Sequence, residues 1–262
     1  MRPSPAVISW KPSWPTPLKS APAGVERVNL RSLRLRLGPL RRLHTADEIP
    51  VAKLRSIKKP ASYNLSFTAA SLRPELVRII AERYLVAGDW DLARDQILSS
   101  NALQCRSRSS AIRLERELRQ RLTTLTPDQI TLVAHATAED RAAIAWLAAC
   151  KRIPFAFAFA VEVLRDKLAA HDPVLRPSDY EGYVESKGLS QPEIAQLTTS
   201  SKNKVRQVLL RMLAEAGLLT DGTALGSIQR PALSPAVTGA VIADNPQWLA
   251  GFLVPDTEIP SR

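Results

Sequence analysis

The sequence predicts a mainly α-helical protein with two helical subdomains. Aromatic residues make up only 5% of the 262 residues, so the core must be built mostly from Leu, Ala, Val and Ile. From about residue 63 onward, apolar residues recur at the spacing of amphipathic helices. Capping residues, prolines and glycines divide this region into short helices.

Residues 1–60 differ from the rest of the chain. They hold 13 Lys and Arg against 3 Asp and Glu, together with nine of the 20 prolines. Within them, Val28–Leu37 alternates apolar and basic residues. We expect a disordered extension or an upstream stretch included by a wrong start codon, with the native start near Val51. The alternative is an arm that binds nucleic acid or a membrane.

The first helical subdomain is expected over residues 61–172. Pro74 suits the first position of a helix and Gly88 its end. Asp89 suits the cap of a second helix, and Thr126 followed by Pro127 starts another. Further helices are expected at about 109–125, 139–151 and 155–170.

The most apolar region of the chain, Ala142–Leu164, is the candidate for a membrane-spanning helix. Lys151, Arg152 and Pro154 interrupt it near its middle. A spanning helix needs about 20 unbroken apolar residues, and charges at mid-bilayer are costly. The sequence therefore predicts two buried helices joined at Lys151–Pro154 and no membrane partner.

Signatures of enzymes are scarce. The chain has no phosphate-binding glycine loop and no GxSxG nucleophile motif. Its histidines and cysteines lack zinc-type spacing, and two thiols alone favour a reducing, cytoplasmic compartment. We predict a protein that is not an enzyme, with no cofactor, metal or small-molecule substrate. The histidines and cysteines that lack zinc-type spacing are His44, His135, His171, Cys105 and Cys150.

The net charge of +11 and the isoelectric point of about 10.1 predict attraction to polyanions. Most of this excess lies in residues 1–60. Residues 61–262 carry 23 Lys and Arg against 22 Asp and Glu, so a binding face there must come from local segregation of charge.

One basic segment begins the helix expected at 109–125. Arg106 and Arg108 precede it and Arg113 follows one turn later, beside the hydroxyl of Ser109. Guanidinium groups, hydroxyls and the free N–H groups of a helix start suit a phosphate. We predict that these four residues bind nucleic acid, with a solvated helix start as the alternative.

The same helix carries two pairs of opposite charge four residues apart. They are Glu115 with Arg119 and Glu117 with Arg121. Such pairs are typical of a solvated helix face, so we expect these arginines to be structural surface residues.

The second subdomain is expected over residues 173–262, after a break marked by Pro173 and Pro177. Short helices are predicted at about 178–186 and 191–197, and a longer one at 201–216. A small β-hairpin is expected at 223–233, and Ser234 suits the cap of a last short helix.

The segment 189–219 resembles a winged helix-turn-helix: a short helix, a polar turn and a longer helix that ends in Gly-Leu-Leu. The front of the longer helix offers donors suited to phosphates and base edges. The alternative is an ordinary amphipathic hairpin with a solvated face. The predicted core residues are Val205, Val208, Leu209, Met212 and Leu213. The predicted nucleic-acid-binding residues are Lys202, Asn203, Lys204 and Arg206, with Ser201 and Gln207 beside them.

Residues 63–254 as a whole resemble the BrxA family of BREX bacteriophage-defence systems, a family long labelled as inner-membrane proteins. The resemblance depends on the order and spacing of several short blocks, each weak alone. These blocks are Tyr63–Thr68, Gly88–Asp91, Arg106–Ser110, Phe159–Arg165, Lys204–Val208 and Leu213–Leu219.

The resemblance implies a protein of two helical subdomains, similar to small RNA-binding helical folds, that binds DNA. It also implies a role beside a methyltransferase, a phosphatase-like protein and an ATPase, and it carries over no catalytic residue. We therefore predict a non-enzymatic accessory factor of a BREX system that binds double-stranded DNA and contacts other BREX components. The alternative is a protein-interaction adaptor with no direct role on DNA.

Overall fold

Helices dominate the computed structural model, which describes residues 65–220 and 226–261. The predicted mainly α-helical class is confirmed. In chain order the elements are the 3-10 turn η2 (Ser66–Ala69), α1 (Pro74–Ala87), α2 (Trp90–Ser99), α3 (Arg108–Leu122), α4 (Pro127–His135), α5 (Ala138–Arg152), α6 (Pro154–Phe159), the π-helical η3 (Ala160–Arg165), α7 (Asp166–Ala169), α8 (Pro177–Ser190), α9 (Pro192–Ala195), α10 (Thr199–Glu215), α11 (Pro235–Asp244), and the 3-10 segments η4 (Pro246–Phe252) and η5 (Asp256–Glu258).

Local capping explains where several helices begin and end. The Asp89 carboxylate accepts hydrogen bonds from the first turn of α2, and Gly88 ends α1 with a left-handed φ of +69°. Thr126 and Gln129 form a capping box at the start of α4. The Ser234 hydroxyl caps α11. The cap positions read from the sequence are therefore confirmed.

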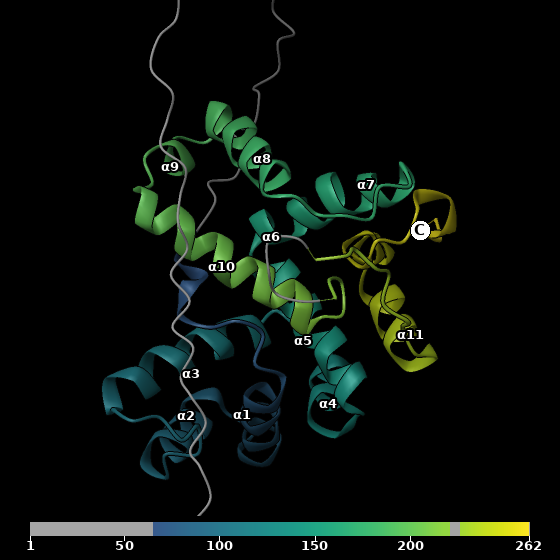
Figure 1. Ribbon diagram of the computed structural model, residues 1–262. Helices are drawn as coiled ribbons and strands as arrows, with labels where there is room; N and C mark the ends of the chain where they lie inside the picture. The colour runs from purple at the N-terminus through teal and green to yellow at the C-terminus, as the bar shows by residue number, and fades with distance from the viewer. Residues whose placement is uncertain (1–64, 221–225, 262) are drawn as a thin grey trace, which may run out of the picture. The chain divides into compact units, whose positions relative to one another are not determined.

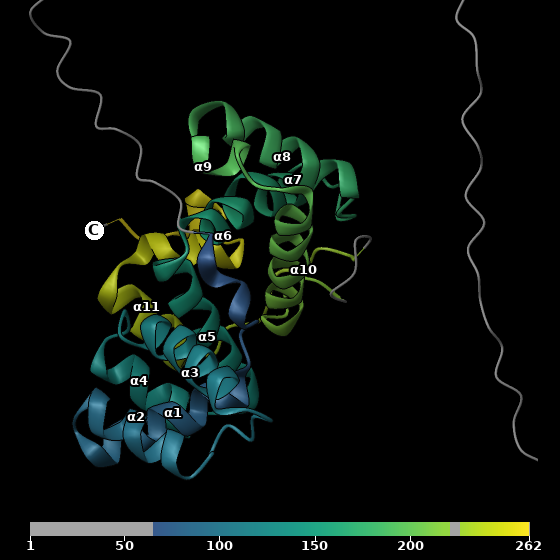
Figure 2. The same cartoon turned by 90° about the vertical axis from the view of Figure 1, so that its left-hand side faces the viewer.

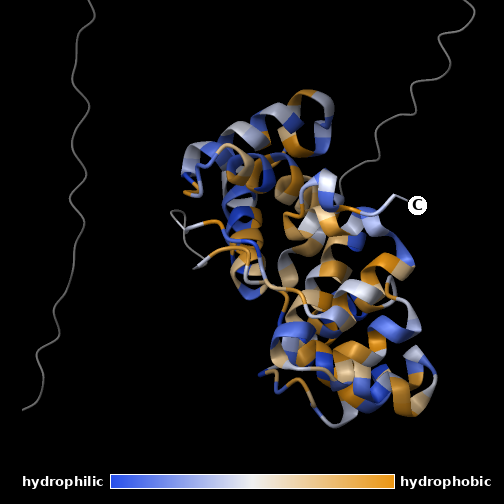
Figure 3. Cartoon of the chain, turned by 90° about the vertical axis from the view of Figure 1, so that its right-hand side faces the viewer, coloured by the Kyte–Doolittle hydropathy of each residue, from blue (hydrophilic) through white to orange (hydrophobic). Residues whose placement is uncertain are grey.

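The core is centred on α5, which lies in the middle of the described body with α1–α4 at one end and α8 and α9 at the other (Figures 1 and 2). Every residue from Ala143 to Cys150 is buried. Trp146 is fully buried, and its indole N–H donates to the carbonyl of Gly251 at 2.9 Å. Figure 3 shows hydrophobic and hydrophilic residues interleaved along these helices. Burial of one large apolar side chain contributes about 1.5–3 kcal/mol.

The apolar region Ala142–Leu164 is divided between two helices, as predicted. α5 ends at Arg152, and the helical stretch that begins at Pro154 is bent from it by 109°. Within the residues that the structure describes, no single helix is both long and apolar enough to cross a membrane.

The prediction for the charged pairs of α3 is partly wrong. Both i,i+4 pairs form, with N···O distances of 2.6 Å for Glu115–Arg119 and 2.8 Å for Glu117–Arg121. However, Glu115 and Arg121 are buried rather than solvated. The segment around η2 packs over the end of α3 and covers Arg121. Glu115 instead faces α2, where Arg94 lies 3.9 Å from its carboxylate.

Arg121 is held by backbone oxygens of that covering segment. Its guanidinium donates to the carbonyls of Phe67, Ala70 and Ser71, at 3.3, 2.8 and 2.7 Å. Burial lowers the pKa of Arg121, and the carboxylate of Glu117 opposes this change. The side chain thus joins the end of α3 to the start of the described chain.

Three short extended pieces lie close together in the C-terminal part. Leu219 forms an antiparallel bridge with Ile228, and Val174 forms another with Ser227. Residues 221–225, at the start of the predicted hairpin, lie outside the described residues. The order is an extended piece, helices α8, α9 and α10, and then two extended pieces. This order is compatible with a winged helix-turn-helix.

All described residues belong to one compact unit, Ser56–Arg262. Its apolar core includes residues from both predicted subdomains, such as Trp146 and Leu209. The division into subdomains 61–172 and 173–262 stays a prediction, and the extension 1–60 lies outside the described residues.

The close packing of Gly251 against α5 and α6 can be tested by substitution. A Cβ atom on Gly251 would lie 3.1 Å from the Phe157 ring and 3.2 Å from the sulfur of Cys150. We expect Gly251→Ala to lower the free energy of unfolding by about 1–3 kcal/mol through overpacking, measured by urea denaturation. The control is Gly239→Ala in α11, where the new methyl group meets nothing within 4 Å. That substitution should stabilise the protein slightly, and a Gly251 variant as stable as this control would contradict the packing.

Candidate nucleic-acid interface

The helix α10 is positioned by one buried face. The hydroxyl of Thr198 caps its start by accepting from the amide of Ser201 at 3.2 Å. All five predicted core residues of α10 are buried, and the helix packs against α5 and η2. At the other end, the Glu215 carboxylate accepts from Ser71 Oγ at 2.8 Å and from the amide of Leu72 at 2.6 Å. Both ends and the inner face of α10 are therefore fixed.

The outer face of α10 presents a polar stripe. We define this α10 stripe as Asn203, Lys204, Gln207 and Arg211, which are all exposed and recur at helical spacing. The Lys204 ammonium donates to the Gln207 side chain at 3.2 Å. Arg211 lies 3.4 Å from the carboxylate of Glu215 and remains 60% exposed. The stripe thus offers two cations and two amides on one helix face.

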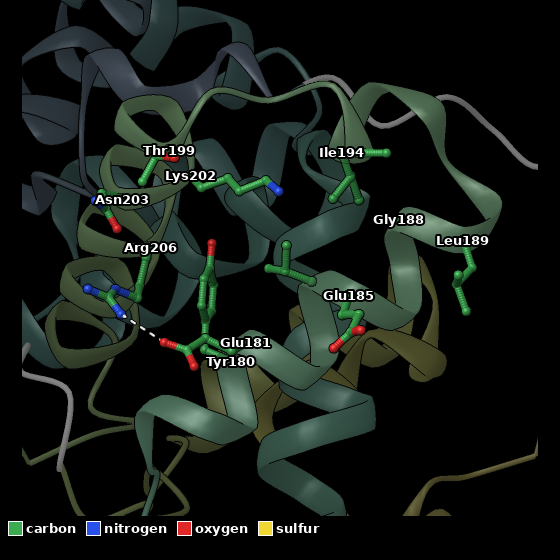
Figure 4. A pocket seen from close by; sticks show the side chains of 12 residues that line it. Tyr180, Glu181, Glu185, Gly188, Leu189, Ile194, Thr199, Lys202, Asn203 and Arg206 are labelled. Carbon is green, nitrogen blue, oxygen red and sulfur yellow. Dashed lines mark ion pairs between the residues drawn. The ribbon is translucent and has the colours of Figure 1, made fainter. Parts of the chain in front are cut away.

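Two other predicted binding residues point elsewhere. Lys202 and Arg206 are half-buried and line a groove beside α8 and α9. Arg206 lies 3.8 Å from the carboxylate of Glu181 (Figure 4). The structure therefore separates the predicted front of α10 into the exposed stripe and a pair of groove cations, with Asn203 at the border of both.

The second predicted cluster lies at the start of α3. Ser107 is the capping residue, and its hydroxyl accepts from the amide of Ser110 at 3.2 Å. The Ser107 hydroxyl also donates to the Ser110 hydroxyl at 2.9 Å. Arg106, Arg108, Ser109 and Arg113 are all exposed. In the part of the chain that the structure describes, none of the three arginines forms an ion pair.

The two clusters do not form one site. α3 packs against α1, α2 and α5, whereas the first half of α10 borders the groove with α8 and α9. Figures 1 and 2 show α3 among the helices at one end of the unit and the start of α10 toward the other end. Each cluster must therefore be judged as a separate candidate.

The chain matches the model of one known protein family. The model of the BrxA family matches residues 61–245, which is more than half of the chain. The chain belongs to the BrxA family. The resemblance seen in the sequence blocks is confirmed, and both candidate clusters lie inside the matched range.

Individual relatives carry the name "BREX protein BrxA". The one from Escherichia coli O9:H4 (strain HS) is 31% identical over 140 residues, which are 53% of this chain and 66% of that protein, slightly under two thirds of its length. The one from Paramagnetospirillum magneticum (strain ATCC 700264 / AMB-1) is 28% identical over 159 residues, which are 61% of this chain and 80% of that protein. A crystal structure of an uncharacterized protein from Magnetospirillum magneticum superposes with a TM-score of 0.64 and 25% identity, covering 73% of this chain and 97% of that one.

Two features of this BrxA-family chain were missed by the sequence analysis. Arg211 continues the α10 stripe, and its place seven residues after Lys204 could have indicated it. The groove beside α10 had no comparable signal, because it depends on how far α8 lies from α10. For metal binding, the described residues contain no group of three or more His, Cys, Asp or Glu that could hold an ion.

Proposed function

We propose that this BrxA-family protein is a non-enzymatic accessory factor of a BREX-type phage-defence system that binds double-stranded DNA through α10. The observation that carries the proposal is the exposed α10 stripe. Lysine, arginine and amide side chains on one exposed helix face suit phosphates and base edges in a major groove. Its position, after a short helix and a turn, is that of a recognition helix.

The start of α3 is the second candidate contact. Its arginines are exposed and have no ion-pair partner among residues 65–220 and 226–261, so they can approach a phosphate without breaking a contact. They are also arranged around a helix start. We give α10 preference because it has amides that can read bases as well as cations that bind phosphates.

Residues 61–262 are nearly neutral, so DNA binding by this part of the chain would have to come from a local basic face and not from its net charge. Gel shifts with a duplex across a salt series compare the full chain with residues 61–262. We expect the shorter protein to bind, with a slope of log K against log salt of about −2 to −4, because each phosphate contact contributes about −0.9. Binding by the full chain alone would assign DNA affinity to residues 1–60 and contradict a role for α10.

A second candidate function is that of an adaptor between BREX components. One observation favours it, namely the apolar groove beside α10, which has no feature suited to a phosphate backbone along its α8 edge. The two functions use different faces of the same helix and are compatible with each other.

A further inference from the structure

A groove with a mostly apolar lining lies between α8, α9 and α10. It encloses about 570 Å³. Its apolar lining includes Val184 on α8 and Ala195 on α9. Ile194 on α9 also lines it (Figure 4). Leu189 stands at its edge and is 88% exposed. A leucine so exposed at the border of an apolar groove indicates a surface that a partner covers.

The two long edges of the groove carry opposite charges. Glu181 and Glu185 lie along the α8 edge, and Lys202 and Arg206 lie along the α10 edge. Only one contact crosses between them among the described residues, the 3.8 Å approach of Arg206 to Glu181. Lys202 has no ion-pair partner there. The acidic edge would repel a phosphate backbone, so the charges do not favour nucleic acid in the groove.

The hydroxyl of Tyr180 adds a polar contact point to the groove. Tyr180 is only 5% exposed, yet its hydroxyl points into the groove and has no hydrogen-bond partner among the described residues (Figure 4). Burial raises the pKa of Tyr180 to about 12, so the group is a neutral phenol. The hydroxyl is accessible from the groove, so it can donate a hydrogen bond to a polar group of a ligand bound there.

The dimensions favour a helix as this ligand. The α8 wall runs from Tyr180 to Leu189, which corresponds to about 14 Å of helix. An amphipathic helix of nearly three turns matches this length and binds such grooves by its apolar face.

We propose that this groove binds an amphipathic helix of a partner protein. The helix has an apolar stripe at spacings of three and four residues, basic residues on the flank beside Glu181 and Glu185, and acidic residues on the flank beside Lys202 and Arg206. A polar group within the stripe pairs with the Tyr180 hydroxyl. The proposal does not rest on DNA binding, because Lys204, Gln207 and Arg211 of the α10 stripe lie outside the groove lining and only Asn203 borders it.

The test uses the full chain and three fluorescent 14-residue helical peptides with the same leucine stripe. One carries Lys on one flank and Glu on the other, and two controls carry Lys or Glu on both flanks. In fluorescence anisotropy, we expect the mixed peptide to bind saturably and about tenfold more tightly than either control, because only it avoids a like-charge edge. Equal binding of all three, or no saturable binding, would overturn the proposal.

Substitutions then locate the binding. Glu181→Lys with Glu185→Lys makes both edges basic, so the peptide with Glu on both flanks should become preferred over the mixed one. This switch also excludes binding to the basic residues 1–60, which are the same in both proteins. Leu189→Ser should weaken the mixed peptide several-fold without affecting the fold, because Leu189 is exposed. Unchanged preferences in the double variant, or full affinity in Leu189→Ser, would place the peptide elsewhere and reject the groove.

Discussion

Replacing Arg121 with methionine is expected to lower the free energy of unfolding by about 3–5 kcal/mol, the cost typical of breaking a buried ionic contact. The substitution removes the donor for three backbone carbonyls and the partner of Glu117. Methionine keeps much of the side-chain length, so the loss reports on unpaired polar groups rather than on a cavity. Urea denaturation followed by circular dichroism measures it.

The matched control is Arg116→Met on the same helix. Arg116 is exposed and has no ion-pair partner among the described residues, so its replacement should change stability by less than about 0.5 kcal/mol. Equal unfolding midpoints for the two variants would mean that the contacts of Arg121 with the η2 segment do not stabilise the fold.

Arg121 also illustrates what the sequence could and could not predict. The i,i+4 pairing with Glu117 follows from spacing alone, because it lies within one helix. The burial does not, because it results from a segment about fifty residues away that packs over the helix. Helix starts were predictable for the same local reason: Asp89, Thr126 and Ser234 each bond to their own first turn.

The candidate site was likewise predictable from the sequence only in part. The buried face of α10 follows from periodicity, and the predicted core positions are all buried. The separation of Lys202 and Arg206 from Lys204 does not follow, since it depends on where α8 lies around the helix. A helical projection gives the angle of each residue, but only the packed neighbours decide whether that angle faces solvent or a groove.

This separation leads to a prediction about DNA binding. In residues 61–262, Lys204→Gln combined with Arg211→Gln should weaken duplex binding about tenfold to a hundredfold near physiological salt. The slope of log K against log salt should become shallower by about two, one unit for each lost phosphate contact. Gel shifts across a salt series measure both quantities, and neither residue supports the core, because both side chains are exposed.

Two further double variants distinguish the other basic groups. Lys202→Gln with Arg206→Gln removes the groove cations, and should reduce binding of the mixed-flank peptide more than binding of DNA. Arg106→Gln with Arg108→Gln removes the charges at the start of α3. If this last variant loses DNA affinity while the Lys204 and Arg211 variant keeps it, the interface lies on α3. The α10 stripe would then be an ordinary solvated face, and the groove would remain the functional surface of α10, since peptide binding there does not depend on where DNA binds.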